Sequence, residues 1–197
     1  GTNNTLNISG SGYGFAFMNA TGNPTTGNLT IANGYTINGN GANSVGILAR
    51  TAGNVSSGAT INMAAGAGSA IVATDGVANT ARTITNTGTI NSLGAGAAVI
   101  NASGAGNTTV NNSGTLLAAN NTAQAILTGS GNDVVALSGA SANTRGEIVL
   151  GTGNDQFSWT AGAFNGGVTF SGADGNDRAT LGDVSLANVI HILSNGG

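Results

Sequence analysis

Three Gly-Asn-Asp triplets are the segments of this sequence whose residue types could bind a ligand. The first begins at Gly131, and the triplet recurs twice at intervals of 22 residues. Oxygen ligands suit Ca²⁺, and calcium-binding β-helix repeats present an Asp every nine residues or so, so that successive turns share one ion. At an interval of 22, each triplet stacks only on its own kind. The three acids are therefore candidate ligands of a weak cation site: Asp133, Asp155 and Asp177.

The same triplet is typical of a tight turn. Gly allows a positive φ, Asn tolerates a left-handed or stacked position, and the Asp side chain accepts hydrogen bonds from nearby backbone N–H groups. We favour the turn, because one carboxylate per rung does not supply the six to eight oxygens that calcium prefers. The sequence therefore predicts no bound cofactor, with calcium as the ion left open.

Catalytic chemistry has less support. The single His, His191, lies in an alternating segment (189–193) that places it on the solvent side of a strand. Glu147 and Arg145 are separated by one Gly, and Asp75 stands alone. β-Helix enzymes that cleave polysaccharides need clustered acids together with a group of suitable pKa. The sequence contains no Ser-His-Asp set, phosphate loop or metal-spaced His pair, so we predict no catalytic residues and no enzyme.

Aromatic residues are the other candidates for a contact surface. Phe15 and Phe17 are spaced by two residues, as are Phe157 and Trp159, so each pair points to one face of a strand. At least one pair is interpreted as core, and a sugar-stacking role for an exposed Trp159 is left open. Phe164, which lies in a segment rich in Gly, is the predicted exposed contact.

Apolar residues in three phases indicate the elements that position these side chains. One set has spacings of 24, 29 and 26 residues: Ile37, Ile61, Ile90 and Leu116. A second follows it by nine or ten residues: Ile47, Ile71, Val99 and Ile126. A third precedes it by six: Ile31, Val55, Ile84 and Val110. Each member of the first set is preceded by a Thr, and Gly, Asn and Ser separate the phases, which indicates three short strands per repeat.

Three strands in about 24 residues fit one coil whose strands pair with their equivalents in the next coil. The sequence therefore predicts an all-β fold, a right-handed parallel β-helix of seven to eight rungs of 22–29 residues. We expect one domain over 1–197, with longer three-strand rungs in 1–128 and tighter rungs in 129–197. The next triplet would begin at Gly197, so we expect the chain to be a segment of a longer protein.

Composition excludes several classes of protein. The chain has 197 residues, 35 Gly, no Cys, 6% charged residues and a net charge of −3. Gly, Asn, Thr and Ser disfavour a helical bundle. Without a basic face, nucleic-acid binding is not expected. No run approaches the roughly 20 apolar residues of a membrane helix.

Two segments carry a family resemblance. They are Gly-Thr-Ile-Asn at 88–91 and Gly-Thr-Gly-Asn-Asp-Gln-Phe-Ser-Trp at 151–159. Together with the Asn/Thr/Gly/Ala composition they resemble passenger domains of Gram-negative autotransporters, in the AIDA-like and pertactin-like adhesin group. The resemblance implies type V secretion and an extracellular location, on the bacterial surface at the outer membrane or released from it. It also implies a C-terminal translocator β-barrel in the full-length protein.

The resemblance implies a non-catalytic function in adhesion or bacterial self-association. The expected partner is a host-surface protein or glycan, or another copy of the chain. The alternative is a polysaccharide-processing β-helix, either a lyase or hydrolase or a tailspike-like protein. Ice binding through Thr rows is a third hypothesis, and it is disfavoured because the alternating Thr residues of 83–89 are not expected to repeat on neighbouring rungs.

Overall fold

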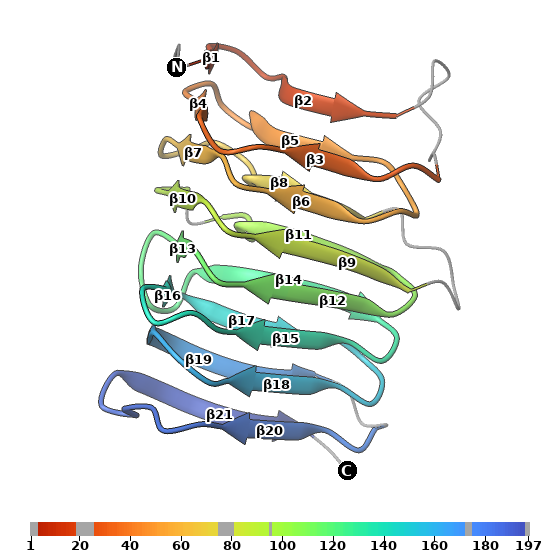
Figure 1. The fold of residues 1–197 in the computed structure, drawn as a ribbon, viewed down its shortest axis with the longest axis vertical. Coiled ribbons are helices and arrows are strands. Elements are labelled where there is room, and N and C mark those ends of the chain that lie inside the picture. Colours follow the sequence, from red (N-terminus) through yellow and green to blue (C-terminus); the bar gives the residue numbers. More distant parts are fainter. Residues whose placement is uncertain (1–3, 19–25, 75–80, 95, 172–174, 196–197) are drawn as a thin grey trace.

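The computed structural model describes residues 4–18, 26–74, 81–94, 96–171 and 175–195. Within these ranges the chain forms strands and turns and no helix. It stacks as a parallel β-solenoid of about six turns, with the amino-terminal rung at the top of Figure 1 and the carboxyl-terminal rung at the bottom. The described residues accordingly contain no helix long and apolar enough to cross a membrane.

Each complete turn has three strands, which lie on three faces. Face A, at the left edge of Figure 1, comprises β1 (Asn4–Ile8), β4 (Tyr35–Gly39), β7 (Thr60–Met63), β10 (Thr89–Ser92), β13 (Thr115–Leu117), β16 (Asn143–Arg145) and the start of β19 (Ala163–Ser171). Face B comprises β2 (Tyr13–Phe17), β5 (Val45–Ala49), β8 (Ile71–Val72), β11 (Ile100–Ala105), β14 (Gln124–Ser130), β17 (Glu147–Leu150), the rest of β19 and β21 (Val189–Asn195). Face C comprises β3 (Leu29–Ile31), β6 (Val55–Ser57), β9 (Arg82–Asn86), β12 (Thr108–Asn112), β15 (Val134–Leu137), β18 (Gln156–Trp159) and β20 (Arg178–Leu181).

Face A and face B join into one 14-stranded sheet because β19 runs along both, and face C is a separate 7-stranded sheet. Within each face every strand pairs in parallel with the equivalent strand of the next turn. The chain returns to each face through a right-handed crossover, which is the hand that nearly all parallel connections take. The predicted right-handed parallel β-helix is thus confirmed.

Alternation along each strand separates core from surface. In β7 and β10 the burial pattern alternates residue by residue, with Ile61 and Ile90 fully buried. The first predicted ladder is confirmed, because these two residues pair with each other, with Ile37 above and with Leu116 below. Stacked β-branched residues fit a pleated surface. Burial of each such side chain contributes about 2 kcal/mol to the free energy of unfolding.

Two other predicted ladders differ from the structure by one member each. Ile100, and not Val99, pairs with Ile71, so the offset from the first ladder is ten residues at that rung as at its neighbours. Leu29, and not Ile31, pairs with Val55. Both errors arise because spacing alone does not distinguish adjacent or alternate apolar residues that are all buried or partly buried.

The predicted rung count is slightly too high. Only about six turns are complete, since β1 and β2 begin the stack without a described strand on face C before them, and β20 is followed by β21 without a described strand on face A. Asp75, the isolated acid of the sequence, lies outside the described residues.

Candidate functional site

The Gly-Asn-Asp triplets lie at the corner where the chain passes from face B to face C. Gly131 and Gly153 have φ values of +138° and +134°, which residues other than Gly rarely adopt. A Cβ at Gly153 would also overlap the carbonyl oxygen of Gly131, and one at Gly175 would overlap that of Gly153. The glycines therefore allow consecutive corners to stack at the spacing of the rungs.

The Asn of each triplet points outward and ties its corner to the next. The Oδ1 of Asn132 accepts the backbone N–H of Asn154 at 2.9 Å, and the Oδ1 of Asn154 accepts that of Asn176 at 2.7 Å. Asn107, one turn earlier, accepts the N–H of Asn132 at 2.9 Å. We call these four exposed residues the corner Asn ladder; each of the first three accepts the backbone N–H of the next member.

The Asp of each triplet points inward and bonds in the opposite direction. The Oδ1 of Asp133 accepts the N–H of Thr108 at 2.7 Å, that of Asp155 accepts the N–H of Asp133 at 2.8 Å, and that of Asp177 accepts the N–H of Asp155 at 3.0 Å. We call the three acids the Asp ladder. These bonds account for all three residue types of the triplet as parts of a turn that holds adjacent rungs together.

Two members of the Asp ladder, Asp133 and Asp155, are fully buried, at 0% exposure, and burial raises the pKa of both carboxyls. Burial raises the pKa of Asp155 to about 6; the N–H of Asp133 opposes the shift, and the neighbouring carboxylates of Asp133 and Asp177 add to it. Burial also raises the pKa of Asp133 above its usual 3.8, with the N–H of Thr108 as the main opposing contact. Asp155 Oδ2 is buried and accepts no hydrogen bond from the described residues.

As a metal site the ladder is incomplete. The described residues contain no group of three or more His, Cys, Asp or Glu side chains placed to hold one ion. Each acid of the ladder already uses one oxygen on a backbone N–H, and consecutive acids belong to different rungs. The expectation that Asp133, Asp155 and Asp177 form turns without a bound cofactor, with calcium as the ion left open, stays a prediction to be tested.

A second cluster lies on the outer side of face B and joins three consecutive strands. Glu147 Oε1 lies 2.8 Å from His191 Nε2 and accepts a hydrogen bond from the Thr169 hydroxyl at 2.7 Å. A register shift in the β19–β21 pairing inserts Ile190 as a bulge just before His191. A Cβ at Gly167 would lie only 2.5 Å from His191 Nε2, so this Gly makes room for the pair.

Sequence reasoning placed His191 on the solvent side but missed its partner. The side chain is 28% exposed and faces outward, yet it is paired with Glu147, which lies 44 residues earlier. That interval is twice the 22-residue period of the triplets. Residues separated by this period lie at equivalent positions on neighbouring rungs, so the period could have predicted the contact.

Phe164 is a correction. It was predicted to be an exposed contact in a turn, but it lies in β19 and is 2% exposed. Its ring centroid is 5.6 Å from that of Trp159 and 5.8 Å from that of Phe157. The surrounding Gly residues indicated a turn, whereas they belong to a strand that bends from face A to face B.

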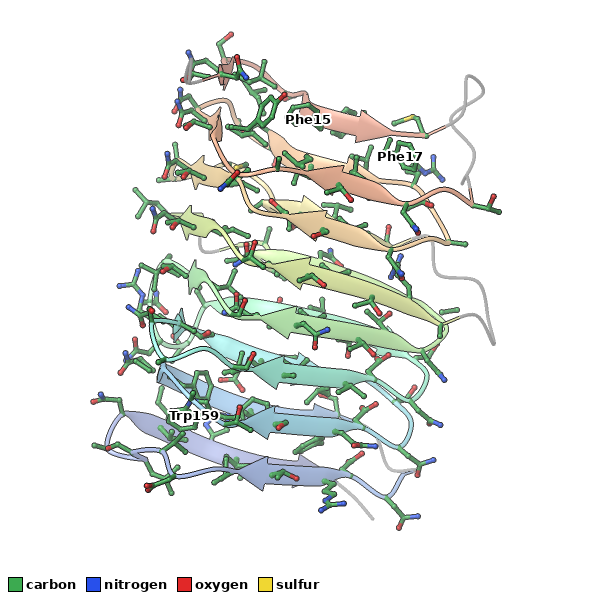
Figure 2. All side chains as sticks on the ribbon, in the orientation of Figure 1. Phe15, Phe17 and Trp159 are labelled. Carbon is green, nitrogen blue, oxygen red and sulfur yellow. The ribbon has the colours of Figure 1, made fainter. Side chains whose placement is uncertain are left out.

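The core interpretation of the pair Phe157 and Trp159 is confirmed, since each is 1% exposed. The indole N–H of Trp159 donates to the carbonyl oxygen of Ala161 at 3.1 Å. Figure 2 shows Trp159 within the stack near the edge where face A runs, and Phe15 and Phe17 near the amino-terminal end. A sugar-stacking role for Trp159 is therefore excluded by its burial.

The outer side of face A carries two regular columns of polar side chains. The Thr column contains one residue per turn over five turns, paired in register: Thr5, Thr36, Thr60, Thr89 and Thr115. Two residues further along each of the first four strands is the Asn column: Asn7, Asn38, Asn62 and Asn91. The sequence signal was the Thr before each apolar residue of the first ladder. The expectation that the Thr residues of 83–89 do not repeat on neighbouring rungs is wrong for Thr89, which belongs to the Thr column, and for Thr83, which pairs with Thr109.

The Asn column is a chain of side-chain hydrogen bonds. The Nδ2 of Asn38 donates to the Oδ1 of Asn7 at 2.8 Å, Asn62 donates to Asn38 at 3.0 Å, and Asn91 donates to Asn62 at 3.2 Å. The first charged residue that continues either column is Arg145, whose guanidinium donates to the carbonyl oxygen of Ala118. Over these turns, face A therefore presents an uncharged, ordered set of hydroxyl and amide groups.

Three hollows on the described surface lie away from the acidic groups. Two lie at the amino-terminal end and share Phe15 and Tyr35, whose rings are edge to face at 6.0 Å. A third borders the Asn column between Asn62 and Leu93. None of the three is lined by an Asp, a Glu or a His.

Comparison of the chain with models of protein families, with curated proteins and with solved structures finds no match. The geometry defines a β-solenoid with structural corners and polar outer faces.

Proposed function

We propose that this chain is a non-catalytic segment of a surface-displayed β-helix of the autotransporter passenger type, acting in adhesion or bacterial self-association. Its place would be outside the outer membrane, with a translocator β-barrel at the C-terminus of the full-length protein. The resemblance of residues 88–91 and 151–159 supports the family, and the β-solenoid agrees with the fold that this family implies.

The observation that carries the proposal is that the regular columns of Thr and Asn side chains on face A carry no charge. Polar groups repeat in register over five turns, and the whole chain has a net charge of only −3. Such a surface offers many hydrogen bonds with little long-range repulsion between molecules. Individually weak contacts repeated along a passenger and over many copies on one cell add through multivalency. The partner would be a host-surface protein or glycan, or another copy of the chain.

The Glu147–His191 pair favours the alternative of a polysaccharide-processing enzyme, because it brings a carboxylate and an imidazole together at a partly exposed position. Glycosidases use two carboxyl groups about 5–9.5 Å apart. The contacts of Glu147 are instead a hydroxyl and an imidazole. The described hollows also lie elsewhere. We therefore favour adhesion or self-association, and polysaccharide cleavage is the result that would support the enzyme.

The experiment compares cells that display the full passenger with cells that lack it, together with the purified chain. We expect displaying cells to aggregate or attach more, with modest sensitivity to salt because the Thr column and the Asn column of face A carry no charge. We expect the purified chain to leave neutral and acidic polysaccharides intact. Polysaccharide cleavage that is lost in both Glu147→Gln and His191→Gln would overturn the proposal in favour of the enzyme, and no gain in aggregation or attachment would overturn adhesion.

A further inference from the structure

We propose that the hollow at the ends of β7 and β10 binds the acetamido group of an N-acetylhexosamine in a glycan. This rests on the proposed function, which it deepens by naming one subsite and the class of sugar that enters it. We call this site the Ala64 hollow; it has a volume of about 310 Å³, at the small end of the range for ligand sites. It is lined by Asn40, Asn62, Met63, Ala64, Asn91 and Leu93.

The sizes of three side chains in one column create the Ala64 hollow. Two backbone hydrogen bonds fix the register: Ala64 N–H to the oxygen of Gly39 and Leu93 N–H to that of Met63, both at 2.8 Å. Asn40, Ala64 and Leu93 therefore occupy equivalent positions on three consecutive rungs. Rungs repeat at about 4.8 Å, so Asn40 and Leu93 lie about 10 Å apart with only a methyl group between them. The hollow is closed at both ends along the solenoid axis and opens outward.

The Asn column supplies a polar wall that keeps both donors and an acceptor for a ligand. Asn62 and Asn91 each donate one amide N–H to the preceding Asn of the column, which leaves a second N–H on each. Leu117, the next residue of the column, has no side-chain donor for the Oδ1 of Asn91. Amides that are hydrogen-bonded in series polarise one another, so the oxygen at the end of the series is strengthened as an acceptor.

Leu93 supplies the apolar wall. Its side chain is 61% exposed, the highest value among the large apolar side chains of the described residues. A ligand methyl group that covers Leu93 and the methyl of Ala64 removes apolar surface from water. None of the described lining residues is charged, so an ionised ligand would lose hydration without gaining a counter-ion. The Ala64 hollow therefore suits a neutral ligand with an apolar part.

An acetamido group combines the three features that these walls require. Its N–H can donate to the Oδ1 of Asn91, its carbonyl oxygen can accept the second N–H of Asn62, and its methyl can lie on Ala64 against Leu93. A hexose without this group has hydroxyls but no methyl, and a hexosamine without the acetyl carries a positive charge. A peptide backbone has the same amide but continues on both sides of it, whereas Asn40 and Leu93 close the hollow. A group that projects from a sugar ring enters end on.

Saturation-transfer NMR on the purified chain tests this site, with methyl N-acetylglucosaminide as the probe. Methyl glucoside and methyl glucosaminide are the control ligands. We expect the strongest transfer at the acetyl methyl and an affinity about ten-fold or more above both controls, which is the size of effect that one added apolar or polar contact has on discrimination.

Two matched variants locate the binding. Ala64→Leu fills the hollow from an outward position, and we expect it to weaken binding of the probe about ten-fold or more. Ala136→Leu makes the same substitution at a partly buried outward position of β15 on face C and should leave binding unchanged. Melting curves confirm that both variants are folded.

Equal affinity for methyl N-acetylglucosaminide and methyl glucoside would overturn the acetamido site, as would an Ala64→Leu variant that binds the probe like the parent. N-acetylalanine methylamide that binds as tightly as the probe would overturn the assignment to a glycan in favour of a peptide. Cell aggregation and attachment are measured separately on the full passenger. Cells that aggregate or attach while the purified chain fails to bind the probe leave the function standing and refute this site. Binding of the probe that Ala64→Leu removes, without aggregation or attachment, supports the site and refutes the function.

Discussion

Lowering the pH from 7 to about 4.5 should stabilise the solenoid around Asp155. Burial raises the pKa of this carboxyl to about 6, against 3.8 in the unfolded chain. A group whose folded pKa is raised binds more protons in the folded state between these two values, so the free energy of unfolding falls as the pH rises through this window. The stabilising contribution is complete below about pH 4 and is lost above about pH 6.

The size of the effect follows from the same two values. A difference of about two pKa units corresponds to about 3 kcal/mol between the protonated and ionised forms. Asp133, whose pKa burial also raises, contributes with the same sign. The ionised form is disfavoured because Asp155 Oδ2 is buried without a hydrogen bond from the described residues, with other carboxylates one rung above and below.

Urea unfolding at a series of pH values between 4 and 8 measures this dependence. Trp159, the only Trp, is buried on the strand that begins at Gln156, so its fluorescence reports unfolding of the rung next to Asp155. The variant Asp155→Asn keeps an oxygen for the N–H of Asp133 but cannot ionise. We expect it to be at least as stable as the parent at pH 7.5 and to have a flatter profile. A parent whose stability rises with pH across this window, or whose profile the substitution leaves unchanged, would refute the burial argument.

Two other predictions concern the corners. Removing calcium with a chelator should leave the melting temperature almost unchanged, because each ladder acid already bonds a backbone N–H; a tight site would add about 2.7 kcal/mol at a hundred-fold excess over Kd. A calcium-dependent shift of that size that is absent when all three acids are changed to Asn would show a cation site. Gly153→Ala should destabilise by several kcal/mol, because φ is +134° and a Cβ would overlap the Gly131 carbonyl oxygen. Gly10→Ala, where a Cβ meets nothing within 4 Å, is the control, and equal melting temperatures for the two variants would contradict the close approach.

The fold was largely predictable because equivalent positions on neighbouring rungs of a solenoid recur at regular intervals in the sequence. Equivalent residues on neighbouring rungs see the same environment, so Ile37, Ile61 and Ile90 recur with a period that sequence comparison within the chain detects. Where two neighbouring residues are both apolar, as at Val99 and Ile100, periodicity no longer selects one, and hydrogen bonding between the strands decides.

The candidate sites were less predictable because they depend on direction and on contacts across rungs. The triplet spacing indicated stacked acids, but not that Asp155 points inward while Asn154 points outward. Phe164 was misplaced because its Gly neighbours indicate turns, whereas here they allow one long strand to change faces. The Glu147–His191 contact spans two rungs, a distance that local alternation does not reach.

Under the proposed function, the Thr column and the Asn column would let the affinity of face A change with the number of turns. Each turn of face A from Thr36 to Asn91 adds one hydroxyl, one amide and one hydrogen bond to the column without altering the core. Stability in a stack of this kind is approximately a sum of rung and neighbour terms, and an interface along one face grows with the same unit. A weak contact per segment is then strengthened by adding turns, with no residue that must be optimised individually. A surface selected in this way needs low charge and exact repetition of small polar side chains more than it needs a pocket, which is the pattern that face A shows.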